Sequence, residues 1–240
     1  MNLVIKMQYS SISNDKIKSL KRLQEKKYRD QTGLFLIEGN HLIEEAKKNN
    51  QLKEVYSLDE KEENTVTEKV MKYITGLDSV PKIIGVCAKK EGKIGNRVVL
   101  LDDVQDPGNL GTIIRSMIAF HADTLIVSED TVDAYAPKVI RATQGMIFHI
   151  NIIRKPLKDI IVELKKDAYK IYGSSVHDGK NIKTIEKNEK IAIIMGNEGK
   201  GIKKEFLKET DENYYIPMNN LCESLNVGVA LSIFLYELDK

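Results

Sequence analysis

The sequence has few of the residues that mark disulfide-bonded folds, metal centres and membrane spans. Its two cysteines, Cys87 and Cys222, lie in different segments without a C-x-x-C pair, which predicts free thiols. Its four histidines are scattered and form no ligand cluster, so we expect no metal site. Apolar runs such as 98–101 are too short to cross a bilayer, and residues 1–8 lack the apolar region of a secretory signal. These absences predict a cytoplasmic protein with no membrane span and no metal.

The chain also lacks the two common glycine-rich nucleotide fingerprints. One turn, DDVQDPGNLG, holds only Gly108 and Gly111, at the wrong spacing for G-x-G-x-x-G. A second cluster, Gly196, Gly199 and Gly201, reads G-x-x-G-x-G, and no Gly-Lys-Ser/Thr follows it. These mismatches argue against a nucleotide-dependent oxidoreductase and against a P-loop enzyme.

The charge is unevenly distributed, although the net charge is only +2. Residues 1–30 contain eight basic side chains (Lys6, Lys16, Lys18, Lys21, Arg22, Lys26, Lys27, Arg29) and three acidic ones (Asp15, Glu25, Asp30). Such a run is either the solvated face of a helix or a contact surface for a phosphate backbone. Charge alone favours the solvated face.

The order of periodic segments predicts two α/β domains, at 1–92 and 96–240, joined by the polar stretch 89–96. In the first domain we expect a helix over 16–29, followed by alternating strands and helices. In the second, fully apolar strands predict a mostly parallel sheet covered on both faces. The predicted strands of that domain are 98–102, 124–127, 149–153, 170–173, 191–195 and 214–216, with a last helix over 225–238.

Three polar turns follow apolar strands in the second domain: DPGNLGTIIRS (106–116), IMGNEGKGI (194–202) and IPMNNLCESLNVGVAL (216–231). Strand ends are where open α/β sheets bind ligands. Turn formation or helix capping explains several of their polar residues, with Ser224 as the expected cap of the last helix. It explains less well Arg115, the only charge on its helix, and Asn226, which we expect inside a helix. Together the turns predict a site that orients a hydroxyl group.

The three turns resemble, in order and spacing, the three motifs of the SpoU (TrmH-type) branch of the SPOUT methyltransferases. RATQG (141–145) resembles that family's link between its first two motifs, and RDQTGLFLIEGNHLIEEA (29–46) resembles its substrate-binding domain. The resemblance implies methyl transfer from S-adenosylmethionine to a ribose 2′-hydroxyl of RNA. It also implies a deep trefoil knot in the C-terminal α/β domain, an exception to the usual unknotted chain. A homodimer with both protomers near each site is expected as well.

The same resemblance assigns roles to individual residues. It implies that Asn109 and Arg115 lie at the methyl-acceptor site, where Arg115 engages an RNA phosphate and helps to deprotonate the hydroxyl. Three further residues complete the active site: Glu198, Ser224 and Asn226. The backbone near three residues and the side chains of two others would hold the cofactor: Gly196, Ile216 and Leu225, with Met218 and Ser174. The residues implied to contact RNA are Lys21, Arg22, Lys26, Arg29 and Arg141.

The RNA itself is left open by the sequence. Ribosomal RNA is favoured, because this type of N-terminal domain accompanies rRNA enzymes more often, while tRNA remains an alternative. A non-catalytic RNA-binding or ribosome-assembly protein on the same fold is a second alternative. The presence of the full set of motif residues argues against that second alternative.

Overall fold

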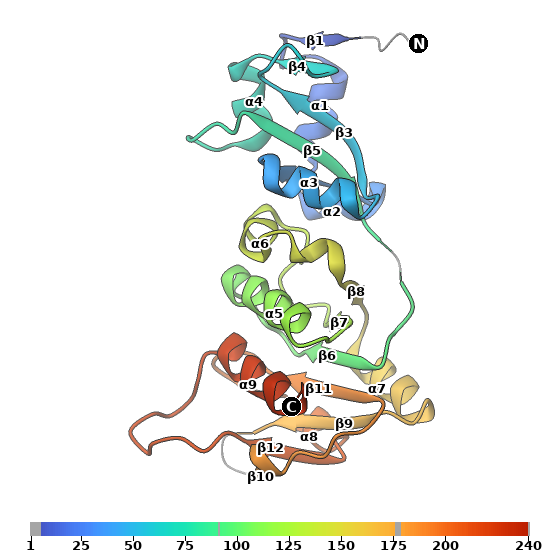
Figure 1. The fold of residues 1–240 in the computed structure, drawn as a ribbon, viewed down its shortest axis with the longest axis vertical. Coiled ribbons are helices and arrows are strands. Elements are labelled where there is room, and N and C mark those ends of the chain that lie inside the picture. Colours follow the sequence, from blue (N-terminus) through green and yellow to red (C-terminus); the bar gives the residue numbers. More distant parts are fainter. Residues whose placement is uncertain (1–5, 91, 176–178, 240) are drawn as a thin grey trace. The chain divides into compact units, whose positions relative to one another are not determined.

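The computed structural model describes residues 6–90, 92–175 and 179–239, and the chain forms two compact units (Figure 1). The first unit contains the described residues up to 90 together with 135–148. The second contains the described residues of 91–134 and 149–239. The first division between the units falls at 90–91, within the stretch 89–96 that the sequence predicted as a linker. Residues 135–148, which the sequence assigned to the second domain, group with the first unit.

The first unit contains a mixed sheet with the strand order β1-β4-β3-β5-β2. The β5 strand is antiparallel to both β2 and β3, whereas β4 pairs in parallel with β1 and β3. The strands are β1 (Met7–Tyr9), β2 (Leu34–Glu38), β3 (Leu52–Ser57), β4 (Asn64–Val66) and β5 (Ile83–Ala88). Helices α1 and α4 add Ile17, Leu20, Val70 and Ile74 to a buried apolar cluster with Leu36 and Ile84 from the sheet.

The basic N-terminal segment forms two helices where the sequence predicted one helix over 16–29. Helix α1 (Asp15–Arg22) ends at Leu23, and α2 (Lys26–Thr32) starts after Glu25, whose backbone is extended (φ −100°, ψ 133°). The buried guanidinium of Arg29 donates a hydrogen bond of 2.8 Å to the carbonyl of Leu23 in the break. The interruption depends on this contact and on local geometry, neither of which hydrophobic periodicity reports. The other helices of this part are α3 (Asn40–Lys48) and α4 (Glu68–Thr75).

Residues 135–148, here called the strap, pack on the sheet of the first unit through α6 (Pro137–Thr143) and the start of η1 (Met146–His149). The fully buried ring of Phe35 on β2 lies with its centroid 4.8 Å from that of Tyr135 and 6.2 Å from that of Phe148. An ion pair of 3.0 Å joins Arg141 of the strap to Glu38 at the end of β2. The strap is therefore part of the core of the first unit.

The second unit contains a sheet whose strand pairs are all parallel among the described residues, in the order β10-β12-β9-β11-β6-β7-β8. The mostly parallel sheet predicted from the apolar strands is confirmed. Its strands are β6 (Arg97–Leu101), β7 (Thr124–Val127), β8 (Asn151–Arg154), β9 (Lys170–Ser174), β10 (Lys180–Asn181), β11 (Ile191–Met195) and β12 (Glu212–Tyr215).

Both faces of this sheet are buried at the strands β11, β6 and β7. Val98 and Leu100 of β6 join a core cluster with residues of α7 and α8, and the alternating Val99 and Leu101 are also fully buried. The helices of this unit are α5 (Pro107–Ala119), α7 (Leu157–Lys166), α8 (Lys204–Leu207) and α9 (Val227–Asp239), with the short η2 (Ile182–Thr184). Helices α5 and α9 pack against each other. The trefoil knot implied by the resemblance stays a prediction.

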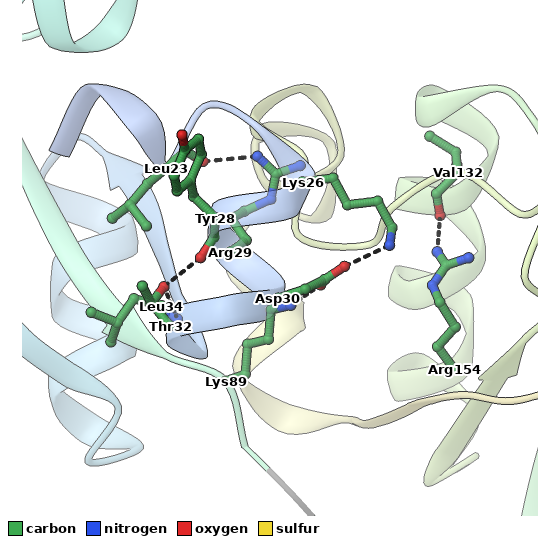
Figure 2. Close-up of polar contacts among 10 residues, drawn as sticks. All are labelled: Leu23, Lys26, Tyr28, Arg29, Asp30, Thr32, Leu34, Lys89, Val132 and Arg154. Atoms are coloured by element: carbon green, nitrogen blue, oxygen red, sulfur yellow. Dashed lines mark hydrogen bonds and ion pairs between the residues drawn. The ribbon is translucent and has the colours of Figure 1, made fainter. Parts of the chain in front are cut away.

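The loop from which the chain leaves the second unit is fixed by one arginine. Arg154, at the end of β8, donates hydrogen bonds of 2.7 Å to the carbonyls of Ser128 and Glu129. A third, of 3.0 Å, goes to the carbonyl of Val132 (Figure 2). The backbone of residues 128–132, which precedes the strap in the sequence, is therefore held in one position. Among the described residues, no helix is both long and apolar enough to cross a membrane.

Replacing Phe35 by Ala tests the strap as part of the first unit's core. The loss of a fully buried aromatic side chain should lower the free energy of unfolding by roughly 3–5 kcal/mol, measured by urea denaturation. Val162→Ala, at a half-exposed position on α7, is the control and should change stability by about 0.5 kcal/mol or less. Equal effects of the two substitutions would show that the strap does not enclose Phe35.

Candidate active site

The first polar turn places Asn109 in the first turn of α5, directly after β6. The side chain of Asp106 caps this helix by accepting the N–H of Asn109 at 2.8 Å, and Pro107 occupies the start of the helix. Both residues favour a helix start, because the cap accepts a free N–H and proline has none to leave unpaired. The side-chain amide of Asn109 is thereby held at the end of the strand.

The second turn is closed by Asn197, which follows β11. Its backbone exchanges two hydrogen bonds with Gly201, at 3.1 and 2.9 Å, and its side-chain oxygen accepts the N–H groups of Gly199 and Lys200. Gly196 is confined as well, since a Cβ there would lie 2.1 Å from the carbonyl carbon of Gly201. Only glycine fits such a close backbone approach. The turn therefore has one well-defined backbone path.

A buried carboxylate that sequence reasoning missed holds the far end of this turn. Asp102, the residue after β6, is fully buried and accepts the backbone N–H of Lys203 at 2.8 Å. The ammonium of Lys203 lies 3.1 Å from the other carboxylate oxygen, and this pairing with Asp102 raises the pKa of Lys203. The only sequence signal for this role of Asp102 was the position of an aspartate at the end of a predicted strand.

The third turn ends at Asn226, which is the N-cap of α9. Its side-chain oxygen accepts the N–H groups of Gly228 and Val229, at 3.0 and 3.3 Å. The sequence predicted Asn226 as a helix-interior residue, which is wrong, and the alternative interpretation of Ser224 as the cap does not hold either. Ser224 is exposed, and its carbonyl accepts the thiol of Cys222 at 3.3 Å.

One hydrogen-bonded chain joins the three turns. The Asn226 amide donates to the side-chain oxygen of Asn109 at 2.7 Å, and the Asn109 amide donates to the Glu198 carboxylate at 2.9 Å. Glu198 also accepts the backbone N–H groups of Asp106 and Gln105, at 3.3 and 3.4 Å. Residues far apart in the sequence therefore form one polar cluster, as the strand-end positions predicted.

These contacts lower the pKa of Glu198. Burial by itself would raise the pKa of its carboxyl group, but the hydrogen bonds from Asn109 and from backbone N–H groups outweigh it and lower the pKa. A carboxylate that already accepts several hydrogen bonds is a poor proton acceptor. In this cluster the Glu198 carboxylate holds the Asn109 amide in one orientation.

A cavity of about 590 Å³ lies between the second and third turns. The five residues that the sequence analysis assigned to cofactor binding all line it: Ser174, Gly196, Ile216, Met218 and Leu225. Three of the predicted active-site residues, Glu198, Ser224 and Asn226, line it too. Asn197 and Lys200 also line the cavity and were not singled out from the sequence. The volume is typical of sites for small organic ligands.

Arg115 lies away from this cluster within the chain. It is exposed on α5 six residues after Asn109, which places it about 9 Å further along the helix axis and on another side of the helix. It does not line the cavity, and no hydrogen bond or ion pair joins it to the other described residues. Within one chain, Arg115 therefore does not lie together with Glu198 and Asn226, as the sequence analysis expected.

Two of the residues assigned to RNA contact rest against tyrosines in the first unit. The Arg22 guanidinium, which is exposed, lies 5.3 Å from the ring centroid of Tyr28. The Lys21 ammonium lies 5.7 Å from the ring centroid of Tyr73. Both cations remain free of carboxylate partners within the described part of the chain, so they can meet an anion from outside.

The remaining three are engaged in contacts within the first unit. Arg29 is only 3% exposed and binds the Leu23 carbonyl, so its predicted role as an RNA contact does not fit its position (Figure 2). Lys26 pairs with Asp30 at 2.6 Å, and Arg141 pairs with Glu38. Burial by itself raises the pKa of Asp30, but hydrogen bonds from Lys26 and Lys89 outweigh it and lower the value to about 2.

The site is built from amide, carboxylate and backbone groups. Over the described residues, no three His, Cys, Asp or Glu side chains come together in a way that could hold a metal ion. The cavity has apolar walls such as Phe234 and Ile216 beside backbone and hydroxyl groups. This combination suits a ligand with an apolar flat part and a polar end.

Comparisons with known proteins agree with this geometry. Residues 96–236 match the SpoU rRNA Methylase family, and residues 14–85 match the MRM3-like substrate binding domain. The 23S rRNA (guanosine(2553)-2′-O)-methyltransferase RlmP of Bacillus subtilis is 38% identical over 96% of this chain and 98% of its own. A putative TrmH family tRNA/rRNA methyltransferase of Staphylococcus epidermidis is 32% identical over 58% of this chain and 57% of its own.

The crystal structure of an AdoMet-bound rRNA methyltransferase from Sinorhizobium meliloti is similar over the whole fold. It has a TM-score of 0.87 and 28% identity, and covers 98% of this chain and 97% of that one. The structure of a putative RNA methyltransferase of the TrmH family from Porphyromonas gingivalis has a TM-score of 0.84 and 26% identity. It covers 95% of this chain and 98% of that one. With three strand-end turns joined in one cluster and matches over nearly its full length, this chain belongs to the SpoU rRNA methylase family.

Proposed function

We propose that the protein transfers a methyl group from S-adenosylmethionine to a ribose 2′-hydroxyl of ribosomal RNA. The observation that carries the proposal is the hydrogen-bonded chain Glu198–Asn109–Asn226 at the edge of the cavity. The similarity to RlmP, a 23S rRNA 2′-O-methyltransferase, over nearly the whole chain supports ribosomal RNA as the substrate class. The match of residues 14–85 to a substrate-binding domain supports the first unit as the part that binds RNA.

The cavity residues fit S-adenosylmethionine. The volume of about 590 Å³ suits a molecule of this size, and the apolar side chains of Ile216, Leu225 and Phe234 suit a flat adenine ring. Gly196 also lines the cavity, and its backbone path is fixed because the adjoining backbone of Gly201 leaves no room for a side chain there. We assign Gly196, Ile216 and Leu225 to the adenosine part, with Ser174 and Met218 beside it.

We assign the methyl acceptor to the amide cluster of Asn109 and Asn226. When bound, S-adenosylmethionine supplies an electrophilic methyl group on a positively charged sulfur. Methyl transfer would form the oxygen–carbon bond as the carbon–sulfur bond breaks, and the hydroxyl proton would pass to solvent water or to an RNA phosphate oxygen. Asn109 and Asn226 are suited to orient the hydroxyl, and Ser224 lies on the same edge. Glu198 holds the Asn109 side chain by accepting a hydrogen bond from its amide.

Arg115 is assigned to the developing negative charge on the ribose oxygen. A guanidinium is a permanent cation that binds phosphate and alkoxide oxygens through paired N–H groups. In this role it holds an RNA phosphate and favours loss of the hydroxyl proton. Because Arg115 stands apart from the amide cluster within one chain, the proposal requires a second protomer to supply it.

An apolar face on α9 supports such a homodimer. Val229 and Tyr236 are 46% and 51% exposed, and their spacing with the partly buried Ile233 places the three on one side of the helix. Helix α9 packs against α5, the helix that carries Arg115. A second copy covering this face would bring its Arg115 toward the site of the first.

We further propose that Lys21 and Arg22 contact the RNA backbone, whereas Lys26, Arg29 and Arg141 stabilise the first unit. Arg22 and Lys21 lie over tyrosine rings and keep their charges available. An ion pair or burial occupies the other three cations. The basic N-terminal segment is thus divided between binding and folding.

The primary test is methylation of ribosomal RNA from a strain lacking the protein, with Arg115→Ala as the diagnostic variant. Calorimetry should detect S-adenosylmethionine binding by both proteins with nearly equal affinity, because Arg115 does not line the cavity. Mass spectrometry of digested RNA should show that the variant's rate falls by roughly 10²–10³-fold or more. Retention of most activity would remove Arg115 from the acceptor site, and absence of cofactor binding would refute the proposed function.

Mixing two inactive variants tests the shared site. Arg115→Ala and Asn226→Ala should each be inactive alone, but mixed dimers contain one site with both residues intact. Co-expression followed by isolation of the mixed species should therefore restore methyl transfer that neither variant shows. A mixture of two separately purified, non-exchanging proteins is the control. If the mixed dimer is inactive, Arg115 serves its own chain.

Two single substitutions separate RNA contact from folding in the basic segment. Arg22→Ala should weaken RNA binding and reduce the slope of log affinity against log salt by about one phosphate contact. Lys26→Ala removes the same charge but only breaks the pair with Asp30, so the slope should stay unchanged. Equal slopes for both variants would show that Arg22 does not contact the RNA and that the basic segment is a solvated surface.

A further inference from the structure

We propose that Lys200 binds the carboxylate of the methionine part of S-adenosylmethionine. The inference rests on the proposed function, since it concerns the same cavity and the same cofactor. It adds a specificity-determining side chain that belongs neither to the amide cluster nor to the backbone groups assigned to the adenosine.

The charges that line the cavity support this assignment. Among its described lining residues, Lys200 is the one cation and Glu198 the one anion. Glu198 already accepts hydrogen bonds from Asn109 and from two backbone N–H groups. The ammonium of Lys200 has no hydrogen-bond or ion-pair partner in the described part of the chain. The neighbouring Lys203 is instead paired with the buried Asp102. A single unpaired positive charge thus borders the cavity.

The turn that carries Lys200 is held in place. The backbone N–H of Lys200 donates to the side chain of Asn197 at 3.1 Å, and Asn197 is bonded to Gly201 on both backbone groups. The Asn197 amide also donates to the carbonyl of Asp103 at 2.8 Å, which ties the turn to the end of β6. Because the backbone is already ordered, binding an anion restricts only the lysine side chain, which lowers the entropic cost.

The cofactor carries a group that matches this charge. Its methionine end has a carboxylate, an ammonium group and the sulfonium, so the carboxylate is its only anionic group. A carboxylate beside apolar walls is stabilised by a charge-assisted hydrogen bond from an ammonium. Lys200 is exposed, so solvent and salt weaken the pair and its contribution to affinity is modest.

The test compares two ligands across protein variants by calorimetry. The ligands are S-adenosylmethionine and decarboxylated S-adenosylmethionine, which lacks only the carboxylate. Lys200→Met should weaken binding of the first by about three- to tenfold and leave binding of the second unchanged or tighter. Lys200→Arg should keep the preference for the carboxylate, and the effect should shrink at high salt. Lys204→Met, an exposed lysine outside the cavity, is the matched control and should bind both ligands like the unsubstituted protein.

The design separates the failure of this inference from that of the proposed function. If the unsubstituted protein binds S-adenosylmethionine but Lys200→Met loses affinity for both ligands equally, or for neither, Lys200 does not bind the carboxylate. A variant that binds the cofactor normally and RNA more weakly would make Lys200 a phosphate contact and overturn the inference. If the unsubstituted protein binds no S-adenosylmethionine, the proposed function itself is refuted and the inference with it.

Discussion

The site depends on one carboxylate that is shared among three strand ends. Glu198 lies in the turn after β11 and accepts hydrogen bonds from the start of α5 and from the Asn109 amide, which in turn binds Asn226 at the start of α9. Each hydrogen bond of this network joins two different turns, so each turn restricts the positions of the other two. The relative placement of α5, β11 and α9 is therefore encoded in amide and carboxylate groups as well as in apolar packing.

Side-chain hydrogen bonds also order the turn at 196–203, although it has no regular secondary structure. Asn197 closes it from within, and Asp102 fixes its far end through the backbone N–H of Lys203. A fully buried carboxylate is costly unless its lone pairs are used, so Asp102 stabilises the turn only while that contact persists. The cavity is therefore bordered by preformed backbone, which suits a ligand recognised mainly by main-chain groups.

The sequence predicted the parts of the fold that local pattern determines. The apolar strands 124–127 and 191–195 coincide with β7 and β11, and the five residues assigned to the cofactor all line the cavity. Short strands such as β1 and β4 carry too few residues to show a period. Arg29 is buried because its guanidinium binds the Leu23 carbonyl where the helix is interrupted, a local geometry that hydrophobic periodicity does not report. The strap leaves its predicted domain because it packs on Phe35, a partner far away in the sequence. The capping role of Asn226 was missed because both it and Ser224 are good caps.

The strap also has a consequence for the order in which the chain acquires structure. Domains fold as units during synthesis, starting from the N-terminus. Here the first unit cannot complete its core when its own sheet strands have emerged, because Tyr135 and Phe148, which cover Phe35, are synthesised after β6, α5 and β7. The start of the second sheet is therefore made while the first core is still open. For the same reason, neither unit can be exchanged between related proteins as one contiguous stretch of coding sequence.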